Sequence, residues 1–213
     1  MSDSCTPSKP GEYPSDCEIT EGYRAMARDH RTPEKSAQFK AALNKGRDIR
    51  LLLLDVDGVL TDGSLIYSHE GHESKAFNTQ DGFGLRLLKE AGVETGVITA
   101  RKSEALARRC EDLKMRYVFQ GAKNKLVAYK EIIKESGCRP VEIGYMGDDW
   151  LDLVLLKRVG LAAAPANAVE AVKEIVHYTT GATGGSGAVR ELCELIIEAK
   201  GLQQQLLQDY MSR

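Results

Sequence analysis

Short apolar runs recur along the chain from Ile49 onward, and stretches with a helical period separate them. The first run, Ile49–Leu54, is nearly continuous, as in a parallel strand buried on both faces. Four similar runs follow at Val93–Thr99, Tyr117–Phe119, Val141–Met146 and Gly160–Ala164. Apolar residues three or four positions apart predict helices over Gly84–Ala91, Ser103–Leu113 and Lys125–Ser136. This alternation predicts an α/β fold, Rossmann-like, with a parallel sheet and helices on both faces.

One segment interrupts the alternation directly after the first predicted strand. Ser64–Tyr67 and Glu73–Phe77 flank a polar stretch that contains Gly71. This pattern predicts a β-hairpin that is too short to be a cap domain. A hairpin inserted there is expected over the carboxyl edge of the sheet, where open α/β folds bind ligands.

The two ends of the chain differ from the part between them. Residues 1–46 hold four of the six prolines and lack a regular apolar period, which predicts a disordered extension. A helix near Glu34–Asn44 is the alternative for its last part. Residues 47–200 are expected to form the folded domain. Residues 201–213 are interpreted as a C-terminal tail, in which Gln203–Leu207 can extend a helix.

Composition narrows the class of protein. The 213 residues are 42% hydrophobic, and the formal net charge of −2 gives no support for nucleic acid or an anionic membrane as the main partner. The five cysteines show no CxxC pair, which favours free thiols in a reducing compartment. Because no apolar run is long enough for a membrane span or a signal peptide, we expect a cytoplasmic enzyme.

Two aspartates follow the first predicted strand in the motif Asp55-Val56-Asp57-Gly58. Residues two apart on an extended segment face the same side, so both carboxylates converge at the strand end. Buried carboxylates are costly unless a cation or hydrogen bonds stabilise them. A Ca²⁺ loop does not fit, because a helix should precede it and its glycine belongs at the sixth position. A satisfied turn remains the alternative.

Further polar residues follow other predicted strands. The motif Gly147-Asp148-Asp149-Trp150-Leu151-Asp152 brings three more carboxylates to the same sheet edge, where hard oxygen ligands suit Mg²⁺. Helix capping is the alternative, and it explains one aspartate better than several. Thr99 closes another strand, where its hydroxyl can donate to a phosphoryl oxygen. Lys125 begins a predicted helix and, taken alone, is typical of a solvated surface lysine.

The order and spacing of these elements resemble the haloacid-dehalogenase-like phosphatases over about residues 49–165. The resemblance implies that Asp55 is the nucleophile and that Asp57 is the general acid and base. It implies that Thr99 and Lys125 hold the phosphoryl group. It also implies that Asp148, Asp55 and the Asp57 backbone carbonyl bind Mg²⁺.

Features outside these motifs are similar to the family of 3-deoxy-D-manno-octulosonate (KDO) 8-phosphate phosphatases. They are the hairpin without a cap domain, Phe77–Gly82, Thr99–Ser103 and Gly184–Glu191. The resemblance implies a sugar phosphate substrate and release of KDO for lipopolysaccharide assembly. It further implies a homotetramer in which each hairpin partly covers a neighbour's site.

Three further residues are candidates for substrate binding: Asn78, Arg101 and Arg190. Arg101 can hold the sugar acid's carboxylate in a bidentate pair, with a surface ion pair as the alternative. The resemblance implies a mobile flap that carries Arg190 toward the substrate, whereas the glycines alone also fit a flexible linker. Ala100 stands where the family usually has Gly, which predicts strain if that position requires a positive φ.

Two alternative functions remain open at this point. One is the same chemistry on the 9-phosphate of a nine-carbon sugar acid, such as sialic acid or KDN. The other is a non-catalytic regulatory module that keeps the fold, which the full set of acidic residues disfavours.

Overall fold

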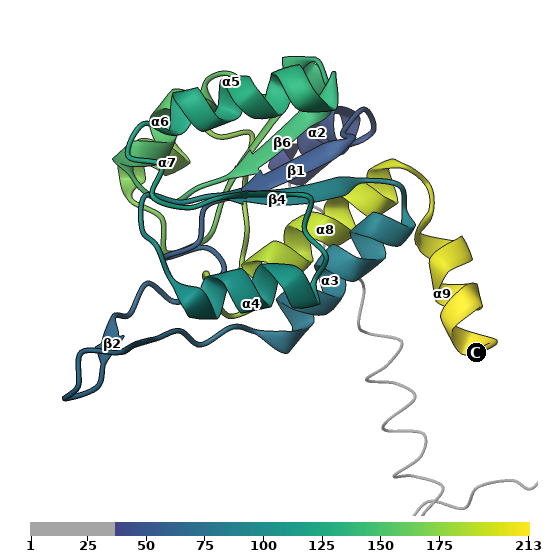
Figure 1. The fold of residues 1–213 in the computed structure, drawn as a ribbon. Helices are drawn as coiled ribbons and strands as arrows, with labels where there is room; N and C mark the ends of the chain where they lie inside the picture. Colours follow the sequence, from purple (N-terminus) through teal and green to yellow (C-terminus); the bar gives the residue numbers. More distant parts are fainter. Residues whose placement is uncertain (1–36) are drawn as a thin grey trace, which may run out of the picture. The chain divides into compact units, whose positions relative to one another are not determined.

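A six-stranded parallel sheet forms the centre of the part of the chain that the computed structural model describes, residues 37–213 (Figure 1). The strand order is β5-β4-β1-β6-β7-β8. Its strands are β1 (Leu51–Leu54), β4 (Glu94–Ile98), β5 (Tyr117–Phe119), β6 (Ile143–Met146), β7 (Leu161–Ala164) and β8 (Tyr178–Thr179). Leu54 is in register with Val97 and Met146, so the residues that follow β1, β4 and β6 meet at one edge.

Helices cover both faces of this sheet (Figure 1). One face carries α2 (Ala37–Gly46), α3 (Thr79–Glu90), α4 (Glu104–Asp112) and α8 (Ala188–Ala199). The other carries α5 (Lys125–Ser136), α6 (Leu153–Leu156) and α7 (Glu170–Lys173). Two short 3₁₀ helices, η1 (Pro140–Glu142) and η2 (Trp150–Asp152), flank β6. None of the helices within residues 37–213 is long and apolar enough to cross a bilayer.

The apolar run of β1 supplies both layers of the core. Leu52 and Leu54 pack in the cluster with α3 and α8, whereas Leu51 and Leu53 pack in the cluster with α5. This division follows from the alternation of side chains along a strand. The predicted α/β class and the parallel sheet are confirmed.

The predicted hairpin is also confirmed. Antiparallel strands β2 (Ile66–Tyr67) and β3 (Glu73–Ser74) pair directly and project away from the sheet (Figure 1). Three apolar side chains at its first strand are about half exposed, namely Leu65, Ile66 and Tyr67. A two-stranded hairpin of this length is marginally stable by itself, so contacts at its base must hold it.

The boundaries of the folded unit differ from the predicted ones. Helix α2 belongs to the compact unit that begins at Ala37, and its Ala42 is fully buried. The prediction for residues 1–36 lies outside the described residues. At the other end, residues 203–211 form helix α9 (Gln203–Met211). The Tyr210 ring packs edge-on against Phe83 and its hydroxyl donates to Glu90 at 2.8 Å. This tail is therefore part of the unit.

Candidate active site

The turn after β1 places Asp55 beside Asp148. The Asp55 backbone N–H donates to the Met146 carbonyl at 2.9 Å, which ties the loop after β1 to the end of β6. Gly58 has a φ of +82°, and a Cβ there would lie 2.0 Å from Asp148 Oδ2. Only glycine permits both this backbone conformation and this close approach. The glycine of the Asp55-to-Gly58 motif thus makes room for the second carboxylate.

Three carboxylates gather at this edge of the sheet. Asp55, Asp148 and Asp152 each offer an oxygen, and these atoms all lie within 4.8 Å of one another. Burial, reinforced by the Asp152 charge, raises the pKa of Asp55 to about 6. Burial and the Asp55 charge raise the pKa of Asp148 to about 7. Such crowding disfavours the ionised forms unless a cation compensates them, so the donor set fits Mg²⁺.

Lys125 lies among these carboxylates instead of at the surface. Asn124 caps α5, and Lys125 follows it with a side chain that is 2% exposed. Its Nζ lies 2.9 Å from Asp55 Oδ1 and 2.7 Å from Asp152 Oδ1. Burial lowers the pKa of Lys125, but the charges of Asp55 and Asp152 outweigh it, so the pKa is raised. Lys125 is therefore a permanent positive charge beside Asp55.

Asp152 holds Lys125 and the loop after β6 in place, a role that we did not predict from the sequence. Its Oδ1 accepts from Lys125 and from the Tyr145 hydroxyl. Its Oδ2 accepts the backbone N–H groups of Asp148 at 3.0 Å and Asp149 at 3.2 Å. Because both oxygens already accept hydrogen bonds, Asp152 suits positioning better than metal ligation. The spacing of four residues between Asp148 and Asp152 was the feature of the sequence that could have indicated this role.

Thr99 follows β4 and is buried at the same edge. Its Oγ1 accepts the Arg101 N–H at 3.3 Å, and its carbonyl accepts the Ala122 N–H at 2.9 Å. Within residues 37–213, Lys114 alone among the non-glycine residues has a positive φ. Ala100 thus adopts an ordinary backbone conformation, and the strain considered for it from the sequence is absent.

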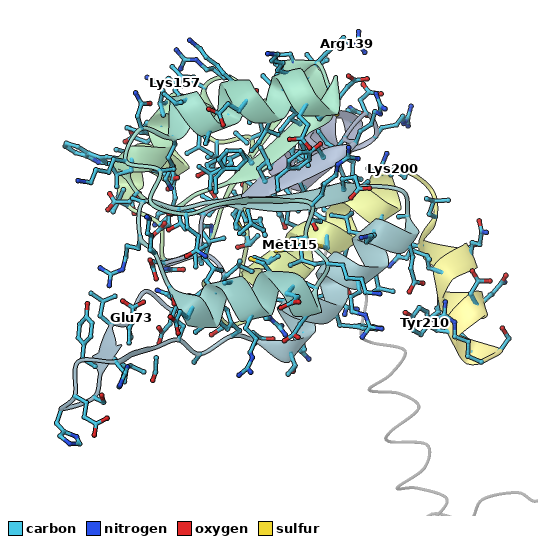
Figure 2. The ribbon with its side chains drawn as sticks, viewed as in Figure 1. Glu73, Met115, Arg139, Lys157, Lys200 and Tyr210 are labelled. Atoms are coloured by element: carbon cyan, nitrogen blue, oxygen red, sulfur yellow. The ribbon has the colours of Figure 1, made fainter. Side chains whose placement is uncertain are left out.

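Asp57 faces the hairpin instead of the three carboxylates. Its Oδ1 accepts from Lys75 Nζ, and its Oδ2 lies 3.7 Å from Arg101 Nε. Glu73 bridges the same two cations, accepting from Arg101 Nη2 and lying 3.2 Å from Lys75 Nζ. The hydrogen bond from Arg101 holds the pKa of Glu73 below its usual value. Figure 2 shows Glu73 on the hairpin.

Several of the residues described above line one cavity of about 240 Å³. It brings together six of the residues that the sequence singled out: Asp55, Asp57, Thr99, Arg101, Lys125 and Asp148. Each lies at or just after the carboxyl end of a strand or at the start of a helix. The cavity therefore sits where an open parallel sheet places its ligands.

The other two predicted site residues lie outside this cavity. Asn78 caps α3 by accepting the N–H of Gln80 at 2.7 Å, and its Nδ2 donates to the Gly185 carbonyl at 3.4 Å. Arg190 lies over the Phe83 ring and donates to Glu194 at 2.7 Å, in a groove between α3, α8 and α9. Within this chain, neither side chain lines the cavity of Asp55.

The glycine-rich segment 181–187, for which a mobile flap was predicted, packs here against the loop after β1 and against Asn167. The Gly185 N–H donates to the Val59 carbonyl at 3.0 Å, and Gly184 donates to Asn167 at 2.7 Å. A Cβ at Gly184 would lie 1.8 Å from the Gly58 carbonyl oxygen. The glycine at this position therefore allows the two backbones to approach closely. Helix α8 begins directly after the segment and contains Arg190.

The amino-acid sequence aligns with known KDO 8-phosphate phosphatases. The KdsC protein of Salmonella typhi is 40% identical over 159 residues, which cover 75% of this chain and 85% of that protein. The chain belongs to the KDO 8-phosphate phosphatase family. A family model described as haloacid dehalogenase-like hydrolase also matches residues 117–192.

Solved structures of this family share the fold. The KDO 8-phosphate phosphatase of Yersinia pestis is 39% identical, with a TM-score of 0.75, and the match covers 76% of this chain and 87% of that one. The Moraxella catarrhalis enzyme, in complex with magnesium ion, phosphate ion and KDO, is 38% identical with a TM-score of 0.78. That match covers 79% of this chain and 97% of the other. The resemblance inferred from the motifs is thus confirmed.

Proposed function

We propose that this protein is a Mg²⁺-dependent phosphatase that hydrolyses KDO 8-phosphate to KDO and inorganic phosphate, for lipopolysaccharide precursor synthesis. One observation supports the proposal most strongly. In this chain, which belongs to the KDO 8-phosphate phosphatase family, Asp55, Asp148 and the buried ammonium group of Lys125 lie at one cavity. The Moraxella relative binds magnesium, phosphate and KDO together.

In the first half of the reaction, a carboxylate oxygen of Asp55 attacks phosphorus. The bond between phosphorus and the C8 oxygen breaks, and that oxygen takes a proton from the protonated Asp57. The product is an aspartyl-phosphate on Asp55, which splits one difficult step into two easier ones. Lys125, 2.9 Å from Asp55, offsets the charge that builds up on the phosphoryl oxygens.

In the second half, water attacks the phosphorus of the aspartyl-phosphate. Asp57, now a carboxylate, takes a proton from that water, while the bond between phosphorus and the Asp55 oxygen breaks. Inorganic phosphate leaves, and both aspartates return to their starting protonation states. Thr99 is the hydroxyl donor at the same cavity, and it steadies the phosphoryl group in both halves.

Asp55 and Asp148 are the side chains that would hold Mg²⁺, with the Asp57 carbonyl as a further ligand. The close approach of Asp148 to Gly58 and the shared space between the carboxylates support this assignment. When bound, the ion supplies positive charge that reduces repulsion between the Asp55 carboxylate and a phosphate dianion.

Arg101 is the residue that selects a sugar acid. Its side chain is 39% exposed at the cavity, and its Nη2 donates to Glu73 and to the Tyr67 hydroxyl. A guanidinium has five N–H donors, so the remaining ones can bind the carboxylate of KDO. The 9-phosphate of a nine-carbon sugar acid is the rival substrate.

Purified protein assayed with Mg²⁺ tests these assignments. We expect hydrolysis of KDO 8-phosphate at a higher kcat/KM than hydrolysis of a nine-carbon sugar acid 9-phosphate. Asp55→Asn should abolish turnover while the protein stays folded. Equal or faster hydrolysis of the nine-carbon substrate would reverse the choice of sugar. Normal turnover by Asp55→Asn would exclude the mechanism, and no hydrolysis of p-nitrophenyl phosphate by the unaltered protein would favour the regulatory module.

The protein also assembles, in this proposal, as a homotetramer in the cytoplasm. A cavity of about 240 Å³ is smaller than the roughly 300–1,000 Å³ typical of ligand pockets. Exposed apolar side chains lie both on the hairpin, at Ile66 and Tyr67, and at the cavity rim, at Trp150 and Leu151. Two different apolar surfaces on one chain permit a head-to-tail contact that closes a ring. The free thiols of Cys110, Cys138 and Cys193 suit a reducing compartment.

Light scattering after size exclusion tests the assembly. A tetramer is expected for the unaltered protein, and Ile66→Glu should shift it toward smaller species because a charge would enter an apolar contact. A fully active monomer would exclude a site shared between copies.

A further inference from the structure

Lys75 is a buried cation that takes no part in the reaction steps proposed above. It follows β3 at the base of the hairpin, and its side chain is 2% exposed. Its Nζ contacts Asp57 Oδ1 and lies 3.2 Å from Glu73 Oε1. Burying an ammonium is costly unless its partners are well placed, and here two carboxylates compensate it.

The contact with Lys75 makes the two oxygens of Asp57 different from each other. Oδ1 accepts from Lys75, whereas Oδ2 lies 3.7 Å from Arg101 Nε, beyond hydrogen-bond distance. A charged hydrogen bond to one oxygen restricts the rotation of a carboxylate. Oδ2 therefore has a defined position at a cavity that Asp55 and Lys125 also line.

We propose that Lys75 is a positioning residue for proton transfer: it fixes Asp57 so that Oδ2 gives the proton to the leaving oxygen. Glu73 is the second member of this device, because it holds Lys75 on one side and Arg101 on the other. The inference rests on the proposed function, since it takes Asp57 as the general acid and base.

The arrangement links the two ends of the substrate. Arg101, which receives the sugar's carboxylate in our proposal, and Lys75, which orients Asp57, share the single Glu73 carboxylate. Glu73 and Lys75 both belong to the hairpin, whose strands are two residues long. The position of the hairpin base therefore sets the geometry of proton transfer as well as the shape of the cavity.

The decisive experiment compares two leaving groups in the Lys75→Met variant. A sugar alkoxide needs a proton as it leaves, whereas p-nitrophenolate leaves readily without one. We expect kcat/KM to fall about 30-fold for KDO 8-phosphate but only about threefold for p-nitrophenyl phosphate, within the range of general acid catalysis. Equal falls for both substrates would indicate a structural role only and would overturn the inference.

Matched variants keep the test decisive. Lys134→Met, on the exposed side of α5, is the control and should behave as the unaltered protein. Lys75→Arg, which keeps the charge, should restore part of the selective loss. Glu73→Gln, which keeps Lys75, should show the same selectivity to a smaller degree, so that the inference stays testable if Lys75→Met folds poorly.

Asp57→Asn separates failure of this inference from failure of the proposed function. It should show the same selectivity for the sugar phosphate, and adding Lys75→Met to it should cause little further loss, because both act on one proton transfer. A selective Asp57→Asn with an unselective Lys75→Met would overturn the inference alone. An unselective Asp57→Asn would overturn the role of Asp57 and the inference together.

Discussion

The cavity and the residues that support it form two halves that are built differently. The sheet half consists of Asp55, Lys125, Asp152 and Tyr145, all anchored on β1, α5, β6 or the loop after it. Asp152 and Tyr145 are fully buried, and Lys125 is 2% exposed. The hairpin half consists of Asp57, Glu73, Lys75 and Arg101, and three of its four side chains are 17% to 39% exposed. Charge is compensated in both halves, but the first is more deeply buried, since Asp55, its most exposed side chain, is 13% exposed.

This difference matches what each half has to do. Attack on phosphorus is the same for every phosphate monoester, so its groups benefit from the most rigid support that the fold offers. The leaving group and the sugar acid vary between substrates. In the proposed mechanism, the groups that meet them sit on a hairpin and on loops, which are easier to change without loss of the core. The two halves should therefore respond differently to substitution.

Among residues that position others, the largest effect is expected in the sheet half, from Asp152→Asn. An amide cannot accept from Lys125 and from two backbone N–H groups at once, and the buried ammonium loses a charged partner. We expect kcat to fall about 100-fold and the free energy of unfolding to fall by about 3 kcal/mol. Steady-state kinetics and urea unfolding measure the two effects. Asp209→Asn, on the exposed side of α9, is the control. Retention of more than half the activity would show that Asp152 is not needed to place Lys125.

A smaller and more selective effect is expected in the hairpin half, from Arg101→Gln. The variant keeps a polar side chain but loses the guanidinium that pairs with Glu73 and faces the cavity. We expect KM for KDO 8-phosphate to rise about tenfold, with a much smaller change for p-nitrophenyl phosphate, which has no carboxylate to bind. Arg108→Gln, exposed on α4, controls for the loss of positive charge. Equal changes for both substrates would place Arg101 outside substrate selection.

The smallest effect concerns how the stabilisation of the folded protein by Mg²⁺ changes with pH. Burial raises the pKa of Asp55 to about 6 and of Asp148 to about 7, above their value of 3.8 when exposed. Without metal, the folded protein therefore holds protons that the unfolded chain has lost, and its stability falls as the pH rises from about 4 to about 7. Mg²⁺ needs the ionised carboxylates, so the shift in Tm on adding Mg²⁺ should be about 3 °C larger at pH 8 than at pH 5.5. Thermal melts at both pH values test this, and an equal shift would mean that neither carboxylate titrates on metal binding.

The residues that follow the strands of the sheet were largely predictable from the sequence, whereas Glu73 and Lys75 on the hairpin were not. Asp55, Thr99 and Asp148 each follow an apolar run, and parallel strands end at one edge, so their meeting follows from topology. Lys75 and Asp57 are 18 positions apart in the sequence, and their contact depends on how the base of the hairpin packs. The alternation along a strand places Glu73 and Lys75 on one side, but it does not say what they face.

The C-terminal part of the chain shows a second limit of the sequence patterns. Strand β8 has two residues, too few for a recognisable period. In α8 the apolar stripe Val189, Leu192, Cys193 and Ile196 is fully buried, yet the preceding glycines suggested a flap. Those glycines allow contact with the loop after β1, which only the three-dimensional structure reveals.

Helix α2 has a practical consequence for shortening the polypeptide. A Cβ at Gly46 would lie 2.9 Å from the Ala199 Cβ and 3.3 Å from Leu195, so the end of α2 packs tightly on α8. The Phe39 ring lies edge-on to Tyr178 at 5.7 Å. A truncated protein that began at residue 47 would uncover an apolar strip on α8 and β8, and such strips promote aggregation. Shortened versions for expression should therefore begin before Ala37, although the motifs of the phosphatase start only at Asp55.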